Sequence, residues 1–461
     1  MNIKKSIFKV FTVNFFQLIS GLIVGFCVPM ILSVEGYANL KTYGLYISYI
    51  GLFHLGFIDG LFIKYGGKKY NDIDRSVLKG EHNFLVIMEM IISIILFFVS
   101  IIMRNIIIFL FSISILPIMI NNFFKYIYQA TGEFNKYTKI MHRYNFIYMI
   151  LNVLLAFVFK NQNYILYCLT TFVANLLAIF YTEFTFLKEN IHTKGIIDKN
   201  TIKNIKTGFF ILLGNLVIIG LFGIDKWFVK LFLSTEDFAY YAFAVSMLNI
   251  INTLVNAISI TFYNYLFENN DEHKINKLKE ILISLGGLSS CAFFALSFIV
   301  NYFIKKYIPS LDIIAVTFAA FPYMVLINAL YVNLYKVNKD EKHYFRVVIT
   351  ILGISILYNI IALILFHNTI SIALATILTL ITWVVYSTKD LKNVKSDKKM
   401  YMYTSLLTTS FLLCAHFLNW WIGGIIYSIT YLIITKIIYR NIISEFIKMI
   451  INILKRILKK Y

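Results

Sequence analysis

FLVIMEMIISIILFFVSIIMRNIIIFLFSISILPIMINNFFKYIY, residues 84–128, contains two long apolar runs that are separated by Arg104 and Asn105. Each run has about the 20 residues that a helix needs to cross the hydrocarbon core of a bilayer. A short polar break between two such runs is typical of a helical hairpin that turns at the membrane surface. The stretch therefore predicts two consecutive transmembrane helices, near 84–103 and 106–128.

The same pattern extends over the whole chain of 461 residues. Hydrophobic residues make up 59% of it and charged residues only 14%, against about 25% charged residues in ordinary globular domains. Because a soluble protein could not bury that much apolar surface, we expect an all-α membrane protein. About fourteen spans are predicted, near residues 11–33, 43–63, 84–103, 106–128, 145–159, 164–187, 207–224, 238–266, 281–304, 313–335, 347–366, 370–388, 401–418 and 420–438.

The distribution of Lys and Arg orients these spans, since cytoplasmic loops carry an excess of positive charge. With the N-terminus inside, nearly all of the 43 Lys and Arg residues fall in the inside segments. The outside segments hold only Lys41, Arg104, Lys160, Lys226, Lys230, Lys305 and Lys306. We therefore expect both termini in the cytoplasm of a bacterial inner membrane. The same arrangement explains the net charge of +20, so no nucleic-acid partner is expected.

A weak internal repeat organises the spans. Paired positions at an offset of 198 or 207 residues include Tyr43 and Tyr241, Tyr137 and Tyr344, and Asn152 and Asn359. The repeating unit has six helices, so both copies insert the same way up, as in transporters with parallel repeats. We expect an N-terminal six-helix lobe at 1–190, a cytoplasmic linker at 191–206, a C-terminal six-helix lobe at 207–390, an additional helix pair at 401–438 and a cytoplasmic amphipathic tail at 439–461.

Polar side chains recur at helical spacing in two spans. Asn249, Asn252 and Asn256 lie on one face of the span at 238–266, and Asn14 and Gln17 lie on one face of the span at 11–33. Small and polar residues also occur where helices pack on one another. For the run of three Asn we favour a water-filled cavity, because polar groups beside lipid are costly.

Ionisable residues at membrane depth are candidate functional residues, since burying a charge in a bilayer needs a compensating partner. Asp59 lies between Gly56 and Gly60, a close-packing pattern that directs it toward protein. It is a candidate for ion coupling or a counter-ion to Lys125, and we favour the counter-ion. Glu89 is the second ion-coupling candidate, with an interfacial position as the alternative.

Further cations and amides lie near the predicted cytoplasmic side. Lys125 follows Asn121 by one turn and precedes Gln129 by one turn, which gives one polar stripe. The candidate residues for an anionic substrate with sugars are Asn14, Gln17, Asp59, Lys64, Lys125, Gln129, Arg143, Asn249, Asn252, Asn256 and Arg346.

Three segments resemble a known family. GYANLKTYGLYISYIGLFHLGFIDGLFIKYGGKK (36–69) is similar to the first hairpin of the polysaccharide and O-antigen flippases of the Wzx type. YQATGEFNKY (128–137) resembles the segment after their fourth span, and FAYYAFAVS (238–246) resembles their eighth. The family belongs to a superfamily that also holds the multidrug MATE exporters and the lipid II flippases.

The resemblance implies a MATE-like fold of two six-helix lobes and a transport function without a cofactor. It implies movement of an undecaprenyl-diphosphate-linked oligosaccharide, an O-antigen or capsule repeat unit, from the cytoplasmic to the periplasmic leaflet. The expected partners are that glycan lipid, the bilayer, and the polymerase and chain-length proteins of the same pathway. We expect no enzymatic activity.

Three alternatives remain open from the residues. A multidrug MATE antiporter would favour acidic residues at depth for cationic drugs, whereas this chain has few. A lipid II flippase shares the topology. An O-antigen polymerase or ligase is an enzyme that also spans the membrane many times, but the longest expected outside segment, about 225–237, is short for a catalytic loop. The four Cys lie far apart inside predicted spans and form no disulfide framework or metal-ligand spacing.

Overall fold

The computed structural model describes residues 3–197, 199–268, 271–338, 341–391, 394, 397–440 and 442, with side chains from residue 9 onward except at 199–200, 254–265, 267–268 and 341. Every regular element in these ranges is a helix. The helices form two compact units, Met1–Phe222 (unit 1) and Gly223–Tyr461 (unit 2). The chain is therefore an all-α protein, as predicted.

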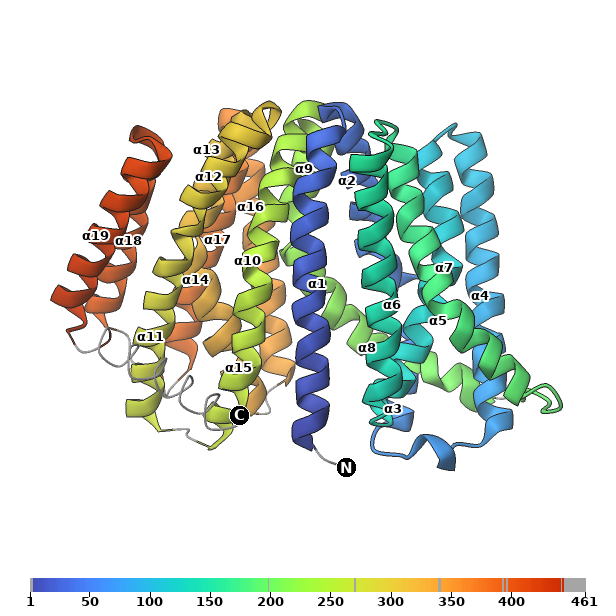
Figure 1. Ribbon diagram of the computed structural model, residues 1–461. Coiled ribbons are helices and arrows are strands. Elements are labelled where there is room, and N and C mark those ends of the chain that lie inside the picture. The colour runs from blue at the N-terminus through green and yellow to red at the C-terminus, as the bar shows by residue number, and fades with distance from the viewer. Residues whose placement is uncertain are drawn as a thin grey trace, which may run out of the picture. The chain divides into compact units, whose positions relative to one another are not determined.

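Within unit 1, long helices run side by side (Figure 1), with α1 against α6, α4 against α5 and α5 against α7. Its helices are α1 (Ile3–Ile31), α2 (Val34–Ser48), α3 (Phe57–Tyr65), α4 (Arg75–Ile102), α5 (Ile106–Ala130), α6 (Phe134–Val153), α7 (Tyr164–Glu189) and α8 (Lys199–Leu221). A π-helical turn at Leu154–Val158 continues α6.

Unit 2 begins with the short helix α9 and also consists of helices that pack lengthwise, such as α16 against α17 and α18 against α19. Its helices are α9 (Ile224–Phe232), α10 (Thr235–Glu268), α11 (Glu272–Ser290), α12 (Ala292–Phe303), α13 (Leu311–Ala319), α14 (Phe321–Leu326), α15 (Val332–Val337), α16 (Glu341–Phe366), α17 (Thr369–Asp390), α18 (Lys398–Phe417) and α19 (Trp420–Ile438).

The tight hairpins predicted from short polar breaks are confirmed. The chain turns at Arg104, Lys160 and His367, each with a positive φ of 46–48°. An Asn follows each turn and caps the next helix; Asn105, for example, accepts hydrogen bonds from the backbone N–H groups of Ile107 and Ile108 at the start of α5. Such caps satisfy donors that the first helical turn leaves open.

Ten of the described helices are long and apolar enough to cross a membrane. Two further pairs of bent helices would raise the number of candidate spans to twelve if each pair counts as one span. The helices α10 and α18 lie where the other two spans are predicted. The chain is thus a multi-pass membrane protein, and fourteen crossings remain a prediction.

Two predicted spans are broken where continuous helices were expected. The span near 43–63 consists of Val34–Leu52 and Phe57–Tyr65, bent by 54°, and the span near 313–335 bends by 42° before Phe321. In the span near 43–63, Leu55 and Gly56 have positive φ values of 50° and 86°. A right-handed α-helix requires negative φ values, so the helix is interrupted at these two residues. In the second, Pro322 in the first turn of α14 lacks the N–H that a continuous helix needs.

The division into units does not follow the predicted linker at 191–206. Helix α8 lies after that linker but belongs to unit 1, where it packs on α3. The boundaries of two six-helix lobes therefore remain a prediction. The amphipathic tail predicted at 439–461 lies almost wholly outside the described residues.

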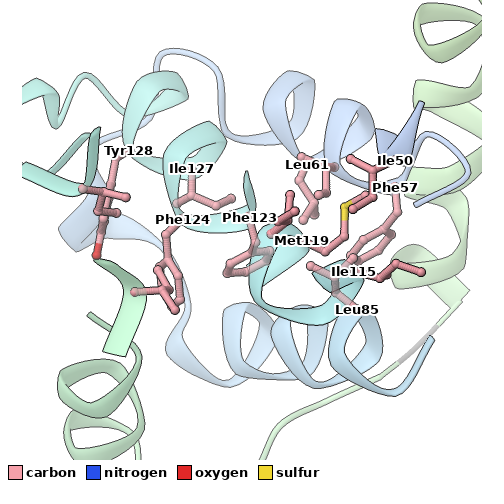
Figure 2. Packing of buried hydrophobic residues seen from close by; sticks show 14 of the residues in the cluster. Ile50, Phe57, Leu61, Leu85, Ile115, Met119, Phe123, Phe124, Ile127 and Tyr128 are labelled. Carbon is pink, nitrogen blue, oxygen red and sulfur yellow. The ribbon is translucent and has the colours of Figure 1, made fainter. Parts of the chain in front are cut away.

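The core of unit 1 is an apolar cluster in which α3, α4 and α5 meet. Figure 2 shows Phe57, Leu61, Leu85, Ile115 and Met119 directed toward one another. Each of these side chains is at most 1% exposed. This packing fixes the position of α3, which carries Asp59 and Lys64.

The close-packing pattern around Asp59 is confirmed. At the crossing of α3 and α8, a Cβ atom on Gly60 would overlap the carbonyl of Asn204, and one on Gly208 would overlap the carbonyl of Gly56. Only glycines allow the two backbones to approach this closely. Asp59 consequently faces protein and is 5% exposed.

Candidate functional site

The break between α2 and α3 carries two ionisable side chains. The Nδ1 atom of His54 accepts a hydrogen bond of 3.1 Å from the backbone N–H of Gly56. The Nε2 atom of His54 lies 3.9 Å from Oδ2 of Asp59, and both side chains are buried. Asp59 was a candidate from the sequence and His54 was not, although an ionisable ring inside an apolar run was a signal for it.

Lys64 lies at the other end of α3, in contact with the start of α4. Its Nζ atom is 2.5 Å from Oε1 of Glu81, which also accepts a hydrogen bond of 2.9 Å from Asn204 on α8. The second oxygen of Glu81 accepts a hydrogen bond of 2.5 Å from the hydroxyl of Tyr65. Glu81 is fully buried, so this carboxylate joins three helices.

A pocket of about 560 Å³ opens beside this cluster. Its walls include Lys64, Lys68 and Lys203 together with Asp72 and Asp74. The wall thus carries both cations and anions, and the charge of Lys64 is already matched by Glu81. By the predicted topology, the pocket lies on the cytoplasmic side.

A second pair of ionisable side chains joins α4 to α7. His82 on α4 is 3% exposed at its side chain and lies 3.0 Å from Oε1 of Glu183 on α7. Glu183 lies near the end of the predicted span at 164–187, and the structure gives it this partner. Glu81 and His82 were not selected from the sequence, because their partners lie 17 and about 100 residues away in the chain.

Lys125 on α5 has no hydrogen-bond or ion-pair partner among the described side chains, and it is half-buried. The expected ion pair between Lys125 and Asp59 is absent from the described part of the chain, where the ionisable side chain next to Asp59 is His54. The break in the helix brings His54 to Asp59, and Lys125 forms no ion pair with this carboxyl. This expectation was therefore wrong for the structure described.

The polar stripe around Lys125 is divided between core and surface. Asn121 is buried and donates a hydrogen bond of 2.8 Å to Asn175 on α7, whereas Gln129 is exposed. Asn121 thus helps to pack α5 on α7. Lys125 and Gln129 are the members of the stripe that remain accessible.

Three other candidates of unit 1 lie on α1 and α6, which pack together. Asn14 is half-buried and Gln17 is exposed. The guanidinium of Arg143 lies 4.9 Å from the ring centre of Tyr181, a cation–π contact that is weaker than an ion pair. These three side chains therefore keep polar groups available for a ligand.

Glu89 lies in the middle of α4 and is fully buried. Neither of its carboxylate oxygens has a hydrogen-bond partner among the described residues. An ionised carboxylate in such surroundings would lack compensation, so the neutral acid is the form that fits this packing. The alternative of an interfacial position does not match its burial.

The candidates of unit 2 lie on α10 and α16. Asn249 is exposed, and Oδ1 of Asn252 accepts a hydrogen bond of 3.3 Å from Asn328. Arg346 on α16 is exposed. The side chain of Asn256 lies outside the described residues.

Unit 2 also contains a polar cluster that sequence reasoning missed. Oδ2 of Asp390 at the end of α17 accepts a hydrogen bond of 2.7 Å from Tyr335 and lies 2.6 Å from Nε2 of His343. The three residues come from separate helices, which no local pattern links. No group of three or more His, Cys, Asp or Glu suited to a metal ion occurs in the described part of either unit.

Comparisons with known proteins give a match in structure only. No family model matches the sequence, and no curated protein matches it. A solved structure of the lipid II flippase MurJ in an inward closed conformation matches with a TM-score of 0.70 and 17% identity. The match covers 94% of this chain and 99% of that one.

A second solved structure is an inward-facing multidrug resistance MATE family transporter of the MOP superfamily. It matches with a TM-score of 0.55 and 12% identity, over 86% of this chain and 96% of that one. At these identities the likeness concerns the fold. The chain therefore has the fold that these two proteins share.

Proposed function

We propose that this protein is a flippase that moves an undecaprenyl-diphosphate-linked oligosaccharide from the cytoplasmic to the periplasmic leaflet of a bacterial inner membrane. The observation that carries the proposal is the fold, which matches a flippase for a lipid-linked substrate over nearly the full length of both chains. The resemblance of residues 36–69 to polysaccharide flippases supplies the substrate class. Both termini then lie in the cytoplasm.

The physical demands of this cargo agree with the accessible side chains. A diphosphate carries two or more negative charges, and transferring a bare ion into hydrocarbon costs on the order of 20 kcal/mol in the idealised limit. Lys125 is a half-buried cation whose charge no described residue balances. Arg143 and Arg346 are further cations, and Asn14, Gln17, Gln129 and Asn249 provide amides for sugar hydroxyls.

The membrane potential supplies a driving force in the required direction. With the cell interior negative, outward movement of an anion is favoured by about 2.3 kcal/mol per charge per 100 mV. Asp59 and Glu89 remain the candidates for coupling to an ion. The polymerase and chain-length proteins that consume the product are the expected partners.

Lipid II is a second candidate cargo, favoured by the higher TM-score of the MurJ match. Both cargoes are diphosphate lipids, so the same cations suit either one. A multidrug antiporter is less favoured, because Lys125 is a cation without a balancing acid among the described residues and would repel cationic drugs.

Deletion of the gene in its source organism tests the proposal. We expect loss of the surface glycan, accumulation of the lipid-linked repeat unit inside, and recovery when an intact copy is returned. Normal surface glycan in the deletion strain would refute the proposed cargo. Rescue of a strain depleted of its lipid II flippase would instead identify lipid II as the cargo.

A further inference from the structure

We propose that His54 and Asp59 form a proton-binding site at the break between α2 and α3, and that proton binding there changes the angle between these helices. The proposal deepens the proposed function and rests on it, because a proton bound at this site would regulate the same transporter. It starts from three observations: a buried His–Asp contact, a strained hinge and a close helix crossing.

The hydrogen bond from Gly56 defines the protonation state of His54. The backbone N–H of Gly56 donates to Nδ1, so this nitrogen carries no proton and the single ring proton lies on Nε2. That proton is directed to the side where Asp59 lies, 3.9 Å away. The neutral ring and the ionised carboxylate then carry one negative charge in a buried position, and no cation of the described residues forms an ion pair with it.

One added proton neutralises this pair, and either location alters the break. On Nδ1 of His54 the proton removes the acceptor of the Gly56 N–H and converts the contact with Asp59 into a true ion pair. On Asp59 it removes an anion from the first turn of α3, where the helix dipole favours negative charge. The proton belongs to the pair rather than to one residue.

The backbone at the break between α2 and α3 is strained. Leu55 has a φ of 50° and Gly56 a φ of 86°, and the two helix segments meet at an angle of 54°. A left-handed conformation at a non-glycine residue such as Leu55 is strained and persists only through its surroundings. The hydrogen bond between His54 and Gly56 spans this residue, so its loss would release the strain.

A change in the angle between α2 and α3 would displace α8, because α8 is in direct contact with the break. Gly56 and Gly60 are in backbone contact with α8 at Gly208 and Asn204, without side chains between them. α8 is the last helix of unit 1 before the chain enters unit 2. A change at the hinge would thus shift the helix that leads to the other half of the protein.

Charged and titratable groups near the pair come from the helices that pack on the break. On α5, Tyr126 interacts electrostatically with Asp59, and Lys125 precedes it in the chain. On α4, Glu81 is held by Lys64 at the far end of α3. On α8, the uncharged Asn204 and Gly208 pack against α3, and Lys203 lines the same pocket as Gly60.

Distance measurements between two spin labels test the proposal on the full-length protein in nanodiscs. The labels are placed at Gly44→Cys on α2 and Ile63→Cys on α3, after replacement of the four native Cys by Ala. A Cβ at Gly44 meets no atom within 4 Å, and Ile63 is 48% exposed, so both sites accept a label. No lipid-linked glycan is added.

We expect the distance distribution to shift between pH 8 and pH 5. His54→Gln and Asp59→Asn should each abolish the shift, whereas His273→Gln, at an exposed position of unit 2, should retain it. Identical distributions at both pH values in the parent protein would overturn the proposal, as would a full shift in both variants. A failed export assay would refute only the cargo, and an absent shift would refute only the proton site.

Discussion

The Nζ atom of Lys64 lies 2.5 Å from Oε1 of Glu81, and this carboxyl also accepts hydrogen bonds from Tyr65 and Asn204. Glu81 is fully buried, while the side chain of Lys64 is 27% exposed. The pair therefore joins α3 and α4 to the first turns of α8. Lys64 was a candidate for binding an anionic substrate, but its charge is already balanced inside the protein.

Lys64→Met should destabilise the protein by about 3 kcal/mol, because it leaves the carboxylate of Glu81 buried without a cation. The free energy of unfolding can be measured in mixed micelles with increasing detergent denaturant. The double variant Lys64→Met/Glu81→Gln should recover part of the loss, since the amide is neutral and its oxygen still accepts a hydrogen bond from Tyr65 or Asn204. Equal stability of Lys64→Met and the parent would contradict a structural role for the pair.

Gly208→Ala should destabilise unit 1 by about 2 kcal/mol or more, because the new Cβ would overlap the backbone of Gly56. Gly214→Ala in the same helix is the matched control. A Cβ at Gly214 meets no atom within 4 Å, so the change should be neutral or stabilise by up to about 1 kcal/mol. Thermal unfolding of both variants checks the difference, and similar midpoints would show that α3 and α8 are not in tight contact.

Lys125→Ala should reduce surface glycan export by about tenfold or more, the loss expected from one charge-assisted contact of about 1.5–3 kcal/mol. Protein level and membrane insertion should stay normal. Lys125→Arg should retain part of the activity, since it keeps the charge. Lys206→Ala, at an exposed position on α8, is the control and should export normally. Full export by Lys125→Ala would make this residue an interfacial anchor.

Glu89→Gln should keep the free energy of unfolding within about 1 kcal/mol of the parent, because an amide has nearly the shape of the neutral acid that fits this packing. Glu89→Lys should fail to accumulate, since it buries an ammonium group without a partner. If Glu89 carries a coupling ion, Glu89→Gln should also lose gradient-driven transport in vesicles while remaining folded. Unchanged transport by Glu89→Gln would show that Glu89 contributes to core packing and does not carry a coupling ion.

Accessible tags test the topology. Tags near residues 75, 198, 340 and 395 should report a cytoplasmic position, and tags near 104, 160, 306 and 419 should report the opposite side. The positive charges predict this pattern, because Lys and Arg accumulate on the cytoplasmic side of spans. One inverted pair of neighbouring tags would remove a hairpin, and the six-plus-six repeat with it.

The amino-acid sequence by itself was sufficient to predict a multi-pass membrane protein and the positions of its helical hairpins. The apolar run at 84–103, the two polar residues after it and the next run predicted the turn at Arg104 that the structure contains. The close approach at Gly56 and Gly60 was also predictable from spacing. These features depend on local composition, because a segment enters a bilayer according to its own hydrophobicity.

Only the tertiary structure decided which side chains meet. Asp59 lies beside His54 rather than the predicted Lys125, and Lys64 is paired with Glu81. Glu89 lies fully buried in the core of unit 1, and Asn121 is bonded to Asn175 in place of water. The partner of a polar group in a membrane protein depends on which helices are neighbours and where a helix breaks, and neither property is present in the periodicity of a single span.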